Sequence, residues 1–289
     1  MPTERPEPID QAALWNGSAG QAWVDAQALL DALFEPIERE LVDDARRRSA
    51  RRVLDIGCSS GATTLAIARS LPAGSRCTGV DISQPLIAAA RARSDAGANV
   101  DFVCADAQRH AFDAGAHDLL VSRFGLMFFD DPVAAFANLR RAATHDASLC
   151  GYAWRSAVEN PFMTTAERGA RAWLPRMPVA DPHAPGQFAF AERDRVAHVL
   201  AEAGWADVAI DALDVPMHFP AASLERYFTR LGPLGRMLAD VDATTRARIV
   251  AAVREAFEPF VHGEDVRFDA ACWRIVARSA ATTSTGGRR

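Results

Sequence analysis

The chain has 289 residues, of which 49% are hydrophobic and 24% charged, a balance typical of a globular protein with a sizeable core. Its formal net charge of −5 argues against a nucleic-acid-binding surface, which normally carries a basic excess. Five cysteines without C-x-x-C spacing favour reduced thiols over a disulfide framework or a zinc site. The polar start of the chain and the lack of a membrane-length apolar run lead us to expect a cytoplasmic protein.

Residues 1–50 are expected to form an N-terminal helical segment. Apolar residues recur near helical spacing from residue 21 to residue 47. Pro36 lies inside this run, and because proline lacks a backbone N–H we expect it to break or kink the run into two helices. The basic stretch ARRRSARR at residues 45–52 is interpreted as a solvated helix end, since arginine complements the helix dipole there.

From residue 52 to residue 154, short apolar runs alternate with alanine-rich segments. The runs RVLDIG, RCTGVDI, VDFVCAD, HDLLVSR and ASLCGYAW are predicted as five strands. Helices are predicted at residues 63–70, 85–94 and 132–143, with a short polar crossing near residues 107–112. Such alternation indicates βαβ units and therefore a parallel sheet.

The regular alternation ends after residue 154. Residues 155–188 hold five prolines and little periodicity, which is typical of a lid or a binding loop. A helix at 191–204, a strand at 205–219, helices between 221 and 261 and a last strand at 266–279 complete the pattern. We predict an α/β, Rossmann-like fold with a seven-stranded, mostly parallel sheet and helices on both faces. The predicted domain spans residues 51–289, with lid insertions at about 155–190 and 221–262 and a disordered tail at about 280–289.

The stretch VLDIGCSSGATTLAIA, residues 53–68, places an acid near the end of a buried strand, then a turn of small residues, then a helix. In an open parallel sheet, ligands bind beyond the carboxyl ends of the strands, where a helix N-terminus offers free N–H groups. A dinucleotide-binding fingerprint requires glycine at positions 57, 59 and 62. Ser59 and Ala62 break that fingerprint, so an NAD-linked oxidoreductase is disfavoured.

Three acids, Asp55, Asp81 and Asp106, stand at the ends of three successive predicted strands. Taken singly, each has an ordinary explanation: Asp55 as a cap for its turn, Asp81 as the N-cap of the next helix and Asp106 as a turn former. Their joint occurrence with a glycine turn after the first strand is improbable as coincidence. The pattern therefore favours a cofactor site at this edge of the sheet.

The spacing of Asp55, Gly57 and Gly61 resembles the first motif, D/E-x-G-x-x-x-G, of the class I S-adenosylmethionine-dependent methyltransferases. The run WNGSAGQAW at residues 15–23 resembles an N-terminal motif of small-molecule members related to the ubiquinone and menaquinone methyltransferases. In those members it helps to close the cofactor pocket. The resemblance implies S-adenosylmethionine as the cofactor of this chain.

The resemblance also implies roles for single residues. Asp81 would accept hydrogen bonds from both ribose hydroxyls, and Asp106 with Ala107 would address the adenine. Many members carry glycine at the position of Ser59, so this turn is slightly less permissive, although serine is small enough that we expect binding to survive. The cofactor-binding set implied in full is Trp23, Asp55, Gly57, Cys58, Ser59, Gly61, Asp81, Ile82, Asp106, Ala107, Ser122 and Arg123.

The implied reaction is an in-line transfer of a methyl group to a small-molecule acceptor in a largely apolar pocket, where positioning supplies much of the catalysis. Phe128 and Phe129 are suitable material for its walls. No histidine or carboxylate stands out as a catalytic base, so the catalytic residues are unknown, and no metal is expected. Candidate acceptor-binding residues are Trp15, Phe124, Met127, Trp154, Arg155, His183 and His218.

Two other functions stay open at this point. The chain could be a catalytically inactive cofactor-binding or regulatory module, or it could transfer another group, such as aminopropyl, from a related donor. We expect a small-molecule partner, without nucleic acid or membrane. The sequence decides neither between monomer and homodimer nor between oxygen, nitrogen and carbon as the methylated atom.

Overall fold

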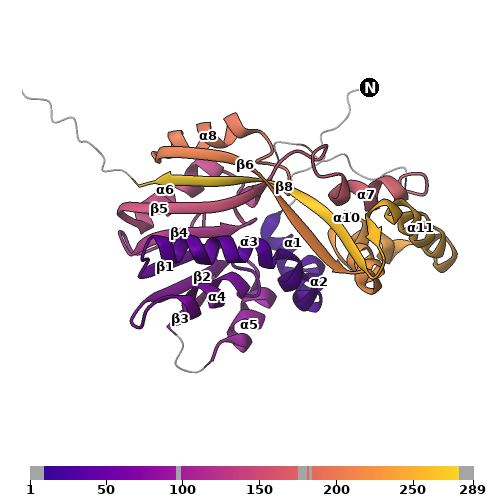
Figure 1. Cartoon of the computed structure of the whole chain (residues 1–289), viewed down its shortest axis with the longest axis horizontal. Coiled ribbons are helices and arrows are strands. Elements are labelled where there is room, and N and C mark those ends of the chain that lie inside the picture. Colours follow the sequence, from indigo (N-terminus) through magenta and orange to yellow (C-terminus); the bar gives the residue numbers. More distant parts are fainter. Residues whose placement is uncertain (1–9, 96–98, 175–180, 182–183, 280–289) are drawn as a thin grey trace, which may run out of the picture.

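One mixed β-sheet runs through the molecule in the computed structural model, which describes residues 10–95, 99–174, 181 and 184–279 (Figure 1). The strand order is β3-β2-β1-β4-β5-β8-β6; the first five strands are parallel, and β8 runs antiparallel to both β5 and β6. The short strand β7 pairs with β8 beside this path. The strands are β1 (Arg52–Ile56), β2 (Arg76–Asp81), β3 (Val100–Cys104), β4 (His117–Arg123), β5 (Ala143–Trp154), β6 (Ala206–Pro220), β7 (Val261–His262) and β8 (Asp265–Arg278).

Helices cover both faces of this sheet, so the predicted α/β, Rossmann-like fold is confirmed. Helices α3, α4 and α5 pack on one side, while α6 and α8 cover the part of the sheet built by β5 and β6. The helices are α1 (Gln11–Asn16), α2 (Ser18–Asp25), α3 (Gln27–Arg47), α4 (Ala62–Ser70), α5 (Gln84–Arg93), α6 (Pro132–Ala142), α7 (Pro161–Ala170), α8 (Arg193–Glu202), α9 (Leu224–Arg230), α10 (Gly232–Met237) and α11 (Ala243–Ala256).

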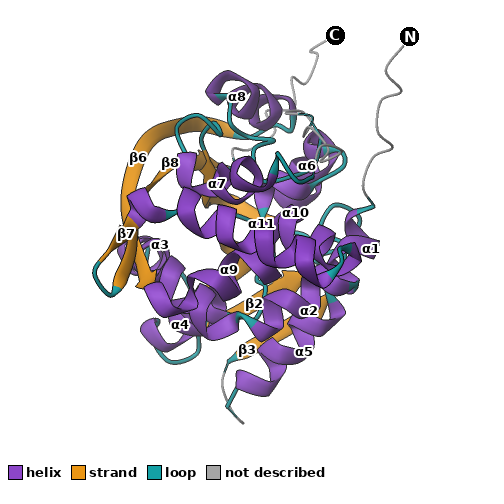
Figure 2. Cartoon of the chain, turned by 90° about the vertical axis from the view of Figure 1, so that its right-hand side faces the viewer, coloured by secondary structure: helices purple, strands orange, loops and turns teal. Residues whose placement is uncertain are grey.

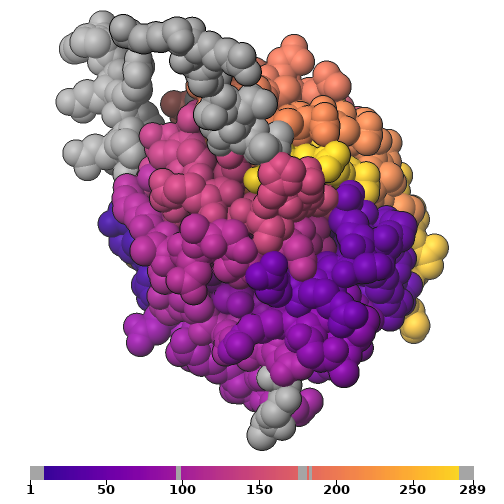
Figure 3. Space-filling view, turned by 90° about the vertical axis from the view of Figure 1, so that its left-hand side faces the viewer, coloured from indigo at the N-terminus to yellow at the C-terminus, as the bar shows by residue number. Residues whose placement is uncertain are grey.

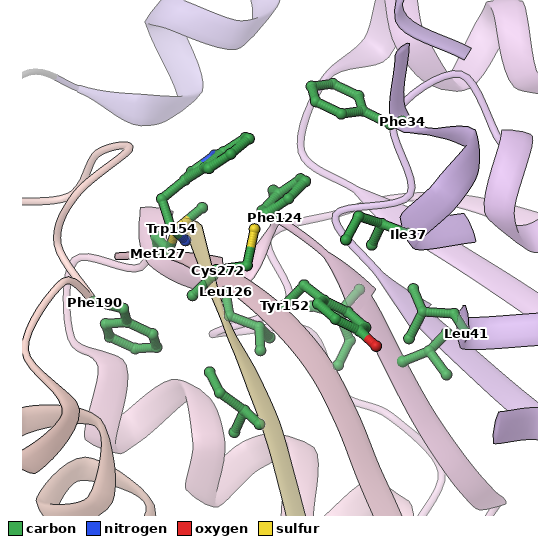
Figure 4. Close-up of a cluster of buried hydrophobic side chains, with 14 of the residues drawn as sticks. Phe34, Ile37, Leu41, Phe124, Leu126, Met127, Tyr152, Trp154, Phe190 and Cys272 are labelled. Carbon is green, nitrogen blue, oxygen red and sulfur yellow. The ribbon is translucent and has the colours of Figure 1, made fainter. Parts of the chain in front are cut away.

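The expectation that Pro36 divides the N-terminal helix is wrong. Helix α3 continues through Pro36, and the chain divides ten residues earlier, at Ala26 between α2 and α3. Proline removes one helical hydrogen bond, but Ile37 and Leu41 on the same helix are completely buried against the sheet. Figure 4 shows both side chains beside Tyr152 of β5. Packing of this apolar face therefore outweighs the local preference of proline.

The second half of the chain adds a cap, which we define as α7, α9, α10, α11 and the far ends of β6 and β8. It lies beyond the carboxyl ends of the parallel strands, on the right of Figure 1 and towards the viewer in Figure 2. Its core is aromatic, with the ring of Phe162 stacked on that of Phe268 at a centroid distance of 3.8 Å. Arg226 of α9 donates a hydrogen bond to the Asp25 carbonyl, which joins the cap to α2.

The first insertion contains more regular structure than its sequence indicates, whereas the second is helical as predicted. Helix α7 lies within residues 155–188, where the prolines favoured irregular chain. Pro161 occupies its first position, where a helix tolerates proline because that N–H has no helical acceptor. Whether the insertions act as lids stays a prediction, and the tail at 280–289 lies outside the described residues.

At the opposite end of the molecule, α3 lies beside strands that come from the C-terminal part of the chain (Figure 3). Asp44, 2% exposed, accepts from Arg274 of β8 at 2.9 Å and pairs with Arg47 at 3.1 Å. Arg48 donates to Ser148 of β5 at 2.9 Å. Arg48 of the basic stretch and Arg274 of β8 therefore join the end of α3 to the sheet.

Candidate functional site

A pocket opens at the carboxyl ends of β1, β2, β3 and β4, between those strand ends and the N-terminal helices. Ten of the twelve predicted cofactor-binding residues line it. They are Trp23, Asp55, Gly57, Cys58, Ser59, Asp81, Ile82, Asp106, Ala107 and Arg123. Since residues so far apart in sequence meet in one cavity, the pocket is the candidate functional site.

The turn after β1 alternates left-handed residues, with φ of +66° at Gly57, +52° at Ser59 and +81° at Gly61. A β-carbon on Gly57 would lie 2.8 Å from the α-carbon of Gly125. The backbones of the turn and of the segment after β4 are therefore too close for any residue other than glycine at position 57. Gly61 does not line the pocket but caps α4, and a β-carbon there would meet the ring of Phe102 at 2.7 Å. Ser59 adopts a left-handed backbone conformation that favours glycine. This explains why many members of the family have glycine at this position.

Asp55 lies at the base of the pocket and is 1% exposed. The Thr64 hydroxyl of α4 donates to its Oδ2 at 2.6 Å. Burial raises the pKa of Asp55 to about 7, and the hydrogen bond from Thr64 acts in the opposite direction. A carboxyl group near half-protonation at neutral pH is thus held rigidly under the turn.

Asp81 ends β2 with both carboxylate oxygens already oriented by the backbone. The N–H of Ser59 donates to Oδ2 at 2.8 Å, and the N–H of Ser83 donates to Oδ1 at 2.9 Å. Burial raises the pKa of Asp81, while these backbone donors lower it. Each oxygen of a carboxylate has a second lone pair, so Asp81 can still accept two hydroxyl donors from a ligand.

Asp106 and Ala107 follow β3, and both have partners within the protein. Asp106 accepts from the Gln108 N–H at 2.9 Å and forms an ion pair with Arg109. The Ala107 carbonyl accepts from Asn138 Nδ2 at 2.9 Å. A ligand at this end of the pocket would share the Asp106 carboxylate with Arg109.

The end of β4 contributes Arg123 to the pocket, whereas the neighbouring Ser122 does not line it. The Ser122 hydroxyl donates to the Ile56 carbonyl at 2.7 Å and accepts from the Gly125 N–H at 3.2 Å, which fixes the backbone between β1 and β4. Phe124 lines the pocket with a left-handed φ of +61°. Ser122 is therefore a positioning residue for this edge of the pocket.

Aromatic rings from the N-terminal helices and from the segment after β4 form the wall facing the strand ends. The Trp15 ring packs edge-on against Trp23 at 5.4 Å and against Phe128 at 5.5 Å. The Ser83 hydroxyl donates to the Trp15 carbonyl at 2.6 Å, and Asn16 donates to the Ile82 carbonyl at 3.1 Å. The N-terminal segment is thus attached directly to the turn that follows Asp81.

Residues 53–146, which include the strands β1 to β4 and the turn, match a family model described as a methyltransferase domain. Residues 53–146 therefore form a domain that is similar to those of the class I S-adenosylmethionine-dependent methyltransferases. S-adenosylmethionine is the cofactor of this family.

Two curated methyltransferases and one solved structure illustrate the resemblance. Aklanonic acid methyltransferase DauC from Streptomyces sp. (strain C5) is 30% identical over 45% of this chain and 61% of its own length. Demethylmenaquinone methyltransferase from Thermus thermophilus is 34% identical over 36% of this chain and 47% of its own. The chain thus spans about half the length of these relatives. The structure of the [4+2]-cyclase SpnF covers 95% of this chain and 98% of its own, with a TM-score of 0.55 at 21% identity, which shows a shared fold alone.

Several residues that the sequence analysis proposed for acceptor binding lie outside the pocket. Trp154 is buried beneath it, with its ring stacked on that of Phe124 at 4.1 Å (Figure 4). The Met127 sulfur accepts from the Trp154 N–H at 3.4 Å, also in the core. Trp154 thus packs against Phe124 and Met127 contacts Trp154, whereas both residues were expected to form the wall of the pocket.

Arg155 and the two histidines are not among the described residues that line this pocket. Arg155 forms ion pairs with Glu159 at 2.6 Å and Asp214 at 2.7 Å, so its donors are taken. His218 lines a separate groove along β6 and β8. His183 lies outside the described residues. Trp15 and Phe124 do line the pocket, and their part in acceptor binding stays a prediction.

Other residues that line this pocket were not identified from the sequence. Gln11 and Phe34 come from the N-terminal helices, and Thr63, Leu86 and Gly125 from segments next to the strand ends. Phe34 lies within the predicted helical run at residues 21–47, and nothing local distinguishes a core phenylalanine from one at a pocket wall. No cluster of three or more metal-ligating side chains occurs in the part of the chain that the structure describes. No helix in that part is long and apolar enough to cross a membrane.

Proposed function

We propose that this protein transfers a methyl group from S-adenosylmethionine to a small, largely apolar acceptor. The observation that carries the proposal is the meeting of three strand-end acids, Asp55, Asp81 and Asp106, with the Gly57 turn in one pocket. Domains of the matched family use S-adenosylmethionine. The two relatives named above are called methyltransferases of aklanonic acid and of demethylmenaquinone, which supports a small-molecule acceptor here.

The cofactor would lie across the carboxyl ends of the first three strands and β4. We assign the ribose hydroxyls to Asp81, because its two oxygens are fixed by backbone donors and each keeps a lone pair for a further donor. The adenine would lie near Asp106 and Ala107, and the methionine portion over the Gly57 turn. The N–H groups at the start of α4 and its dipole favour negative charge close to this turn.

S-adenosylmethionine supplies an electrophilic methyl group, and the chain supplies a dry, oriented site for it. The rings of Trp15, Trp23, Phe34, Phe124 and Phe128 line the cavity and keep water from the reacting atoms. Because the site holds acceptor and donor in line, the two reactants need not find this geometry by collision. This positioning accounts for much of the rate acceleration. The aromatic surface also suits a flat, apolar acceptor.

Proton removal by the protein is not part of this proposal. No histidine lines the described pocket, Asp55 is bonded to Thr64, and burial raises the pKa of Cys58 well above its ordinary value. We therefore expect an acceptor whose nucleophilic atom is already ionised, or carries a free electron pair, at neutral pH.

Calorimetric titration with S-adenosylmethionine and S-adenosylhomocysteine tests the cofactor assignment, with NADH as a control ligand. Asp81→Asn should weaken binding of both by about 10-fold to 100-fold, because one charged acceptor of two hydroxyl donors is lost. Asp101→Asn removes an exposed aspartate that pairs with Arg76 at the surface and should leave affinity unchanged. Full affinity in Asp81→Asn would reject the ribose assignment.

A turnover assay distinguishes a methyltransferase from a module that binds the cofactor without catalysis. Release of S-adenosylhomocysteine from S-adenosylmethionine, measured against a panel of phenols, carboxylic acids and amines, would identify the acceptor class. Cofactor binding without turnover on any member of a broad panel would favour the regulatory module. Absence of binding by either form of the cofactor would refute the proposal as a whole.

A further inference from the structure

Arg123 ends β4 and is one of the residues that line the pocket, and its side chain is nine-tenths buried. Its Nη1 atom has no hydrogen-bond partner among the described residues. The acid nearest to it in an ion pair is Glu38, whose Oε2 lies 3.9 Å away, beyond hydrogen-bond reach. Burial lowers the pKa of Arg123, but arginine stays protonated in proteins. The pocket thus contains a buried cation with an N–H that those residues leave unpaired.

A purely structural arginine is the simpler explanation, and Arg93 shows what such a residue looks like nearby. Its Nη2 pairs with Asp31 at 2.7 Å, and its Nη1 donates to the Ser60 carbonyl at 2.9 Å. Within the described residues, Arg123 has instead the long ion pair with Glu38 and the ring of Phe34, 5.4 Å from its central carbon. A buried cation whose ion pair is this long is costly, so a further anionic partner would stabilise Arg123.

The position of Arg123 in the sheet indicates which part of a bound cofactor it would meet. Gly125, two residues further on, is in closest contact with Gly57 of the turn. Asp55, at the base of the same turn, is among the charges that act on Arg123. Asp106 follows β3, and β1 and β2 separate that strand from β4. Arg123 therefore lies at the end of the pocket assigned to the methionine portion, away from the adenine end.

We propose that Arg123 binds the α-carboxylate of the donor and thereby selects S-adenosylmethionine over its decarboxylated form. This inference rests on the proposed function. A guanidinium offers parallel N–H groups whose geometry matches a carboxylate, and the weak contact with Glu38 leaves these groups for a ligand. The decarboxylated donor brings only positive charge next to a buried cation. Transfer of aminopropyl, which the sequence left open, is disfavoured on this ground.

Paired titrations with S-adenosylhomocysteine and its decarboxylated analogue test the inference directly, because the two ligands differ only in the carboxylate. The wild-type protein should prefer S-adenosylhomocysteine by about 100-fold, the loss typical of leaving one member of a buried charge pair alone. In Arg123→Met this preference should fall close to one, mainly through weaker binding of S-adenosylhomocysteine. Arg123→Lys keeps the charge but loses the parallel donors, so an intermediate ratio is expected.

Arg93→Met is the matched control, since it removes a neighbouring cation whose donors are already used within the protein. Its ligand ratio should equal that of the wild type, which would exclude a general effect of positive charge. The ratio also separates binding from folding, because a damaged site weakens both ligands together. Should Arg123→Met misfold, the lower ligand ratio expected for Arg123→Lys, which keeps the buried charge, tests the role of Arg123 instead.

Equal binding of the two ligands by the wild-type protein would overturn the inference while leaving the methyltransferase assignment intact. An unchanged ratio in Arg123→Met would do the same. If that variant instead lost turnover of an acidic acceptor with its donor preference preserved, Arg123 would bind the acceptor and the donor assignment would be wrong. Failure of the wild-type protein to bind S-adenosylhomocysteine at all would remove the proposed function itself.

Discussion

Replacing Asp55 by asparagine measures the cost of burying a carboxyl group under the turn. The group is 1% exposed, and burial raises its pKa from 3.8 to about 7 in the folded protein. A raised pKa means that the folded state holds the proton more tightly than the unfolded chain. Its contribution to stability is therefore complete below about pH 3.8 and is lost as the pH rises to about 7.

The size of the effect follows from that interval. Each tenfold change in proton affinity corresponds to about 1.4 kcal/mol, so ionised Asp55 costs the folded state about 4 kcal/mol above pH 7. Between pH 5 and pH 8 the wild-type protein should lose about 3 kcal/mol from this group. Asparagine does not titrate, and any cost of its extra N–H groups is the same at both pH values. The free energy of unfolding of Asp55→Asn relative to wild type should thus rise by about 3 kcal/mol over this range.

Urea unfolding followed by tryptophan fluorescence at pH 5 and pH 8 gives both free energies. Asp101→Asn provides an exposed control of the same chemistry, for which the difference from wild type should stay within about 0.5 kcal/mol at both pH values. A difference between Asp55→Asn and wild type that does not change with pH would refute the reasoning. It would mean that Asp55 ionises in the folded protein as easily as in the unfolded chain.

Three further substitutions test how the pocket is supported. Gly61→Ala should lower the free energy of unfolding by about 2–4 kcal/mol, because the residue has a φ of +81° and its β-carbon would lie 2.7 Å from the Phe102 ring; a loss below about 0.5 kcal/mol would mean that the turn adapts. Trp154→Ala should cost about 3–5 kcal/mol in urea unfolding through the cavity left behind Phe124, and a near-neutral result would show that the core collapses around it. Asn160→Ala should cost about 2 kcal/mol, since its amide exchanges two hydrogen bonds with the backbone of β8; a loss below about 0.5 kcal/mol would contradict this.

The sequence by itself was enough to predict where the parallel strands end and which residues lie at those ends. Short apolar runs and the acids that close them are local patterns, and parallel strands bring their carboxyl ends to one edge wherever such a sheet forms. Asp55, Asp81 and Asp106 could therefore be placed together from their positions along the chain. The helices predicted from residues 85 and 132 begin at Gln84 and Pro132, although the N-cap of the first is Ser83 and not Asp81.

Only the tertiary structure decided where the longer elements lie. Pro36 stays helical because of its neighbours' burial, and Phe34 lines the pocket because α3 crosses the strand ends. The aromatic run after β4 divides, with Phe128 at the pocket and Met127 in the core, although the two are adjacent in sequence. These outcomes depend on contacts between distant segments, which no local pattern encodes. The same holds for Arg123, since a missing partner is a property of the packed molecule and not of the sequence around it.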